Sequence, residues 1–163
     1  MGQRAEDLAA RFETAVHDFA QTVQSCPDGK WNAVCEAPWT VAQVAQHVAG
    51  QFPLETEFLF ASAEGRDLPA YTMADVNQKN DARAAAEATV TKDHVLKTLH
   101  EGAPPLASWI RSLSDDQLDH AAPLGLAGGT NVTLQQLLEG GVLIDHVAGA
   151  HLQSIKAVIA SEQ

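Results

Sequence analysis

Positive charge, cysteine and long apolar runs are all scarce in this 163-residue sequence. There are 10 Lys and Arg residues against 21 Asp and Glu, which gives a formal net charge of -11 at pH 7. A surface this acidic repels phosphate groups, so we expect no nucleic-acid partner and no binding to an anionic membrane surface. No segment approaches the roughly 18 uncharged apolar residues of a membrane-spanning helix, so we expect no such span.

The cysteine count and the polar N-terminal sequence indicate the cellular compartment. Two cysteines, Cys26 and Cys35, are too few for a disulfide framework, and we expect reduced, partly buried thiols. The opening MGQRAEDLAARFETAV lacks the continuous apolar stretch of a secretory signal. Glu6 stands where a myristoylation signal needs Ser or Thr. We therefore expect a cytoplasmic protein.

What the sequence does have is apolar material in helical spacing. Hydrophobic residues make up 45% of the chain, enough for one core, and we expect residues 1–163 to form a single domain. Apolar side chains recur three and four positions apart, the pattern of amphipathic helices. The helical segments expected from this pattern are 3–25, 41–60 with a bend at Pro53, 72–88 as the most polar helix, 91–113 with a break or kink at Pro104-Pro105, and 133–160.

Caps and turns agree with these boundaries. Thr40 with Gln43, Ser114 with Gln117 and Thr133 with Gln136 each have the spacing of a capping box, and Thr91 can cap a further helix. We expect residues 30–39 to form an ordered loop, and the glycine-rich stretch 121–132 to form an extended lid over one end. Nowhere do β-branched residues alternate over a strand length. The predicted fold is all-α, an antiparallel four-helix bundle with additional short helices.

Three of the seven histidines lie among apolar residues. His17, His94, His100 and His120 are interpreted as structural or solvated, since lone histidines are poor ligand candidates. His47, His146 and His151 instead stand near buried stripes of two helices. An imidazole near a core costs free energy unless it is hydrogen-bonded or bound to metal. Three protein ligands with one open position are typical of a catalytic metal site.

The spacing of His146 and His151 complicates this interpretation. Five residues turn two side chains roughly 140° apart on a regular helix. A single-turn π-bulge, made easier by Gly140, Gly141 and Gly149, would bring both to one metal. Without the bulge only one of them is a ligand, and Asp145 is then a candidate to orient a ligand or to replace one.

Two motifs resemble the DinB/YfiT-like superfamily, which includes the mycothiol-dependent maleylpyruvate isomerases. WTVAQVAQHVA at 39–49 is similar to the start of that family's second helix, and DHVAGAHLQSI at 145–155 to its last-helix motif. NQKN at 77–80, after Tyr71, resembles the asparagine-bearing third helix of some members. The resemblance implies a DinB-type bundle, often dimeric, with His47 and His146 or His151 as metal ligands. The family's last-helix ligands usually stand four apart, so the extra residue here departs from the pattern.

These observations predict a metal-dependent enzyme, with the reaction left open. The expected cofactor is one divalent transition metal (Zn, Ni, Fe or Mn), which activates a low-molecular-weight thiol or water in S-transfer, isomerisation or hydrolysis. The expected partners are a small-molecule substrate and a second copy of the chain. Glu55 and Glu57 are interpreted as a solvated face. The alternatives are a non-catalytic dimeric bundle that binds metal or a small ligand, and a degenerate member without metal.

Overall fold

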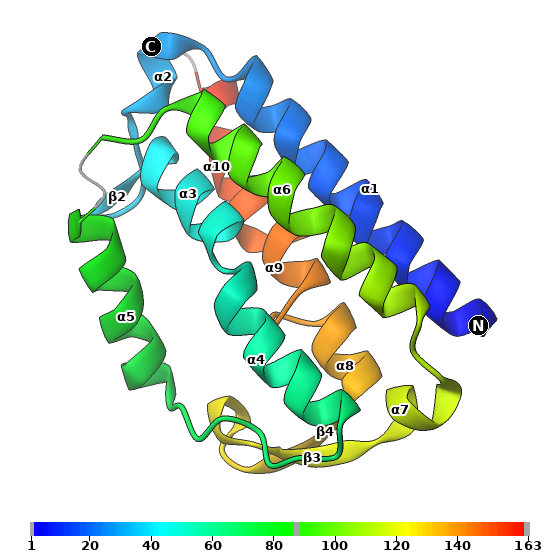
Figure 1. Cartoon of the computed structure of the whole chain (residues 1–163). Helices are drawn as coiled ribbons and strands as arrows, with labels where there is room; N and C mark the ends of the chain where they lie inside the picture. The colour runs from blue at the N-terminus through cyan, green and yellow to red at the C-terminus, as the bar shows by residue number, and fades with distance from the viewer. Residues whose placement is uncertain (1, 87–88, 162–163) are drawn as a thin grey trace.

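A computed structural model describes residues 2–86 and 89–161 of the chain. Most of these residues are helical (Figure 1). The longer helices are α1 (Gln3–Ser25), α3 (Val41–Gly50), α4 (Phe52–Ala63), α5 (Met73–Ala86), α6 (Lys92–Arg111) and α10 (Ala150–Ala160). The shorter elements are α2 (Asp28–Trp31), α7 (Asp115–Asp119), η1 (Gly125–Ala127), α8 (Leu134–Glu139), α9 (Ile144–Ala148) and the strands β1 (Val34–Glu36), β2 (Trp39–Thr40), β3 (Ala121–Leu124) and β4 (Thr130–Thr133).

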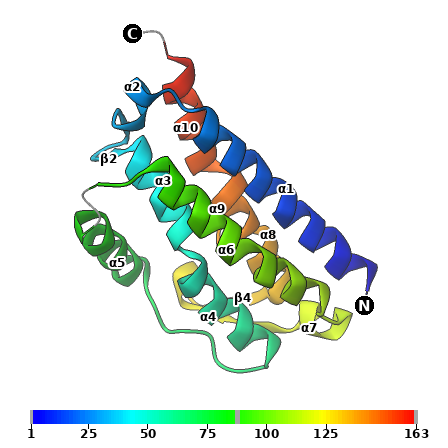
Figure 2. The same ribbon diagram turned by 45° about the horizontal axis from the view of Figure 1, so that its top comes forward.

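The bundle is built from α1, α6, the α3–α4 pair and the α8–α9–α10 series. α6 lies antiparallel along α1, and both views show α3 and α4 running beside α6 (Figures 1 and 2). α9 and α10 return beside α1 and α3 and close the bundle. The predicted antiparallel four-helix bundle with short extra helices is confirmed. Among the described residues, no helix is long and apolar enough to cross a membrane.

The predicted helix starts are confirmed at their caps. Thr40, Ser114 and Thr133 each accept a hydrogen bond from the backbone N–H three residues later, and the Gln side chain at that position accepts one from the cap's own N–H. Thr91 accepts a hydrogen bond from the backbone N–H of His94. These bonds satisfy donors that a helix start otherwise leaves without partners, so the local sequence fixes where four helices begin.

The prediction that the connecting segments lack strands is wrong in two places. The expected loop at 30–39 contains the end of α2 and the antiparallel pair β1–β2. The glycine-rich stretch forms the β3–β4 hairpin, in which Gly128 and Gly129 adopt φ values of 64° and 83° that favour glycine. Ala122 and Leu124 alternate inward and are buried. Strands of two to four residues are too short to give a readable alternating pattern.

Neither proline site breaks a helix at the proline itself. α6 continues through Pro104 and Pro105 without a break. Both prolines are exposed, as are His100 and Glu101, so the carbonyl groups that lose their helical partners can bond to water. The bend expected at Pro53 is instead a boundary at Gln51. Pro53 lies in the first turn of α4, where its missing N–H costs little.

The expected last helix, 133–160, is divided into three. It is interrupted at Gly140 and again at Gly149.

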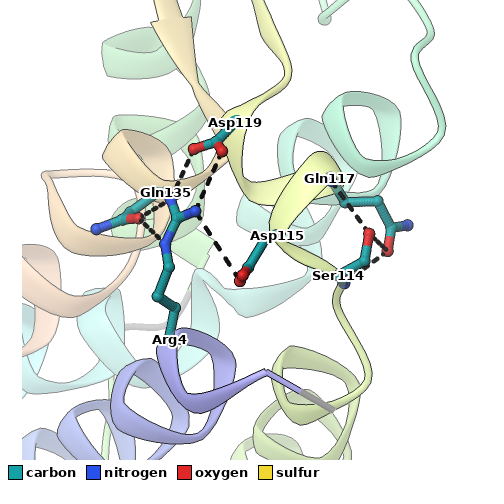
Figure 3. A network of polar contacts seen from close by, with 6 residues as sticks. All are labelled: Arg4, Ser114, Asp115, Gln117, Asp119 and Gln135. Atoms are coloured by element: carbon teal, nitrogen blue, oxygen red, sulfur yellow. Dashed lines mark hydrogen bonds and ion pairs between the residues drawn. The ribbon is translucent and has the colours of Figure 1, made fainter.

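A polar network holds α7 and the start of α8 against α1 (Figure 3). Arg4 at the beginning of α1 donates to Asp119 of α7 at 2.7 and 3.1 Å and to Gln135 of α8. This network joins the first turn of α1 to the connection between α6 and α8.

α5 stands apart from the bundle beside α3 (Figures 1 and 2). None of the residues 73–86 is buried, which agrees with the prediction that this helix is the most polar one. Its expected end at Ala88 lies outside the described residues. Arg83 fixes one part of α5, because its Nη1 donates to the Gly50 carbonyl at 2.9 Å and to Gln51 Oε1 at 3.0 Å. α5 is therefore attached at the α3–α4 boundary.

Candidate functional site

The three histidines singled out in the sequence meet in space. His47 lies on α3, two turns after its cap at Thr40, while His146 lies on α9 and His151 at the start of α10. Each offers one ring nitrogen, and the three nitrogens lie within 4.8 Å of one another. The Nε2 atoms of His47 and His146 are 3.0 Å apart. The ring centroids are separated by 4.9 to 5.2 Å.

A break in the last helix brings His146 and His151 together, in place of the expected π-bulge. Gly149 separates α9 from α10, with φ -88° and ψ -129°. A Cβ at this position would overlap the carbonyl oxygen of Asp145 and would lie 2.6 Å from its Oδ1. Only a residue without a side chain fits here, so the close approach of the two helix ends depends on glycine.

Two glutamates lie against the outer nitrogens of the paired histidines. Both carboxylate oxygens of Glu36, on β1, lie close to His151 Nδ1, at 2.9 and 3.0 Å. Glu55 Oε1, on α4, lies 2.6 Å from His146 Nδ1, although the two groups lack the alignment of a hydrogen bond. The glutamates thus contact the Nδ1 atoms, and His146 Nε2 lies toward His47 Nε2. Carboxylates in such positions fix the orientation of metal-binding imidazoles.

The sequence did not identify these glutamates. Glu57 is exposed as expected, but the solvated position expected for Glu55 is wrong, because Glu55 is 4% exposed. Glu55 lies on the buried side of α4, the helix that starts at Phe52 after the boundary at Gln51. The one sequence signal was Pro53 itself, since proline is favoured in the first turn of a helix. Asp145, the candidate for orienting a ligand, is exposed.

Burial sets the protonation of His47. Desolvation, with smaller contributions from His146, His151 and Arg83, lowers the pKa of His47 to about 3. His47 is therefore neutral near pH 7 and keeps a lone pair on one ring nitrogen. Burial also raises the pKa of Glu55, and the neighbouring His146 opposes that shift.

The histidines lie on one wall of a cavity of about 530 Å³. Apolar side chains of α4 and β2 line part of it, including Leu54, Phe58 and Trp39. α5 contributes a polar wall with Asn77, Asn80 and Asp81. From the glycine-rich hairpin expected to act as a lid, Leu126 reaches the cavity. The site thus combines converging ring nitrogens with a space large enough for a small molecule.

The other four histidines take no part in this cluster. His17, His94, His100 and His120 are exposed. Cys26 is buried and Cys35 half-buried, and both are free thiols as expected. Burial raises the pKa of both thiols, that of Cys35 to about 11 with a contribution from Glu36.

Comparisons with known proteins identify the family and the fold of this chain. The family described as the mycothiol maleylpyruvate isomerase N-terminal domain matches residues 12–139. The crystal structure of a mycothiol-dependent maleylpyruvate isomerase superposes with a TM-score of 0.67 at 13% identity, over 99% of this chain and 64% of that one. A histidine-to-alanine mutant of the isomerase gives 0.66 at 12% identity, over 99% and 65%. A search of curated proteins found no match.

The chain thus spans about two thirds of the length of the solved structures that it resembles. At this level of identity those structures show a shared fold. The family match covers most of the sequence, including α3 with His47. This chain belongs to the mycothiol maleylpyruvate isomerase N-terminal domain family, within the DinB/YfiT-like superfamily.

Proposed function

We propose that this chain is the metal-binding part of an enzyme that activates a low-molecular-weight thiol or water, with His47, His146 and His151 as ligands of one divalent metal. The convergence of three ring nitrogens within 4.8 Å beside a cavity carries the proposal. A tetrahedral zinc site with Zn–N bonds of about 2.1 Å places its nitrogens about 3.4 Å apart. The 3.0 Å between His47 and His146 is close to that separation.

The donor set suits such a metal. His47 is neutral because its pKa is about 3, so it offers a lone pair at pH 7. Glu36 and Glu55 face the Nδ1 atoms of His151 and His146 and leave Nε2 free to coordinate. Neutral imidazole favours zinc, nickel or iron, whereas manganese prefers oxygen ligands.

A divalent metal with an open position lowers the pKa of a thiol or water bound there. Residues of this chain shape the surroundings of that open position. Glu36 and Glu55 orient two of the rings, and the apolar walls at Leu54 and Phe58 limit the access of bulk water. The names of the family and of the solved relatives favour a thiol cosubstrate over water. The reaction class is S-transfer or thiol-dependent isomerisation, with hydrolysis as the alternative.

Cobalt titration of the untagged protein tests the metal site. We expect one equivalent of Co²⁺ to produce the visible absorption of a nitrogen-ligated four-coordinate ion, as three ligands and one open position require. His47→Ala, His146→Ala and His151→Ala should each lose that spectrum, while His100→Ala, an exposed histidine, should keep it. Unchanged spectra in all three site variants would refute the assignment of ligands.

Thiol transfer tests the activity. We expect the zinc-loaded protein to accelerate transfer of mycothiol to monochlorobimane, an uncharged electrophile. His47→Ala should abolish the acceleration while circular dichroism shows a retained helical fold. Metal binding without acceleration of either thiol transfer or hydrolysis would leave a non-catalytic metal-binding bundle and refute the proposed enzyme.

A further inference from the structure

The α5 side of the cavity beside the histidines carries an acidic group and no cationic one among the described residues. Among the described residues that line it, Glu36, Glu55 and Asp81 are acidic, and there is no lysine or arginine. Glu36 and Glu55 face histidines, whereas Asp81 lies on α5, which carries none of the three. Asp81 is exposed, so a carboxylate of a bound molecule placed against α5 would meet like-charge repulsion and find no cationic partner there.

The cations of α5 are engaged elsewhere. Arg83 donates through Nη1 to the Gly50 carbonyl and to Gln51 Oε1. Lys79 places its Nζ 4.5 Å from the centre of the Tyr71 ring. Neither side chain lines the cavity. Their contacts hold α5 in place and leave the Asp81 carboxylate on the cavity wall without a cation beside it in the described part of the chain.

Two buried acceptors in the cavity also lack hydrogen-bond partners within the described residues. Glu55 is 4% exposed; its Oε1 lies 2.6 Å from His146 Nδ1, and its Oε2 has no partner in the described part of the chain. Asn80 Oδ1 is likewise buried without a partner. Asn77 lines the same wall. Buried acceptors are normally satisfied, so the cavity calls for a molecule that brings hydrogen-bond donors.

We propose that the molecule processed here carries an amine, amide or hydroxyl group at the end remote from the metal, that this end contacts Asn77, Asn80 and Asp81, and that Asp81 selects against a carboxylate there. The proposal rests on the proposed metal site and specifies its substrate class. The substrate would accordingly be neutral or cationic at its distal end. A dicarboxylate, such as the name maleylpyruvate denotes, would leave its second carboxylate facing Asp81.

Three zinc-binding probes of equal length test this selection. They are benzohydroxamates with an aminomethyl, a hydroxymethyl or a carboxylate group at the para position. Calorimetry on the zinc-loaded protein should show the aminomethyl probe binding about tenfold, and the hydroxymethyl probe about threefold, more tightly than the carboxylate. Asp81→Asn should weaken the aminomethyl probe, strengthen the carboxylate probe and leave the hydroxymethyl probe nearly unchanged. Asp18→Asn, an equal change of charge at an exposed position of α1, should alter none of them.

A measurement without metal separates this inference from the proposed function. Ligand-observed NMR on the metal-free protein should detect benzylamine but not benzoate, and Asp81→Asn should reduce that preference. Equal binding of the aminomethyl and carboxylate probes, or a preference that survives Asp81→Asn, would overturn the inference even if zinc binds. A preference for benzylamine in a protein that binds no metal would support Asp81 selection and refute the metalloenzyme.

Discussion

Replacing Gly149 with alanine should separate the two histidines on either side of it. The new Cβ would overlap the Asp145 carbonyl oxygen and lie 2.6 Å from Asp145 Oδ1, so α9 and α10 must move apart. Overpacking of this kind costs about 1–3 kcal/mol of folding stability. Loss of the groups that orient metal ligands typically weakens binding by about 10- to 100-fold, and we expect zinc affinity to fall by that factor.

Gly141→Ala is the matched control, because a Cβ there meets no atom within 4 Å. Urea unfolding of the metal-free proteins gives the stability change, and zinc titration against a chelator gives the affinity. Gly141→Ala should resemble the wild type in both measurements. Wild-type zinc affinity and stability in Gly149→Ala would refute the argument that glycine at this break brings His146 and His151 together.

Three further predictions concern single groups. Cys35, with a pKa of about 11, should react slowly with iodoacetamide at pH 8, and Glu36→Gln should speed the reaction, measured by mass spectrometry. In the metal-free protein the pKa of His47 is about 6.5 in the unfolded state and about 3 in the folded state. Between these two values only the unfolded state gains a proton. Stability should therefore fall as the pH drops across this window, by at most about 1.4 kcal/mol per pH unit, and His47→Gln should flatten the fall in urea titrations. Thr40→Ala removes the α3 cap and should cost about 1 kcal/mol by the same assay, and an unchanged midpoint would contradict the role of the cap.

Local signals predicted much of the bundle. α1 was expected at 3–25 and begins and ends there, because its apolar stripe and the following Pro27 are both local features. The caps at Thr40, Thr91 and Thr133 were likewise readable, since a cap involves residues only three apart. The short strands escaped notice, because two to four residues give too few alternating positions to read, even where Ala122 and Leu124 are buried.

The histidines of the candidate site were identifiable, but their arrangement was not. An imidazole among apolar residues is visible in the sequence, whereas the route that joins His146 to His151 depends on a helix break at Gly149. Either a π-bulge or a helix break can bring together two histidines five residues apart, and tertiary packing decides which of the two forms. Glu36 and Glu55 come from separate elements far from both histidines in sequence, so only the fold brings them to the rings.

The metal content of the purified protein tests the central claim most directly. Elemental analysis should compare untagged wild type with His47→Ala, His146→Ala, His151→Ala and the exposed control His100→Ala, each incubated with zinc and dialysed. We predict about one metal ion per chain in the wild type and in His100→Ala, and a loss in the other three. A wild type that stays empty after incubation with zinc, nickel, iron and manganese would contradict the three-histidine metal site.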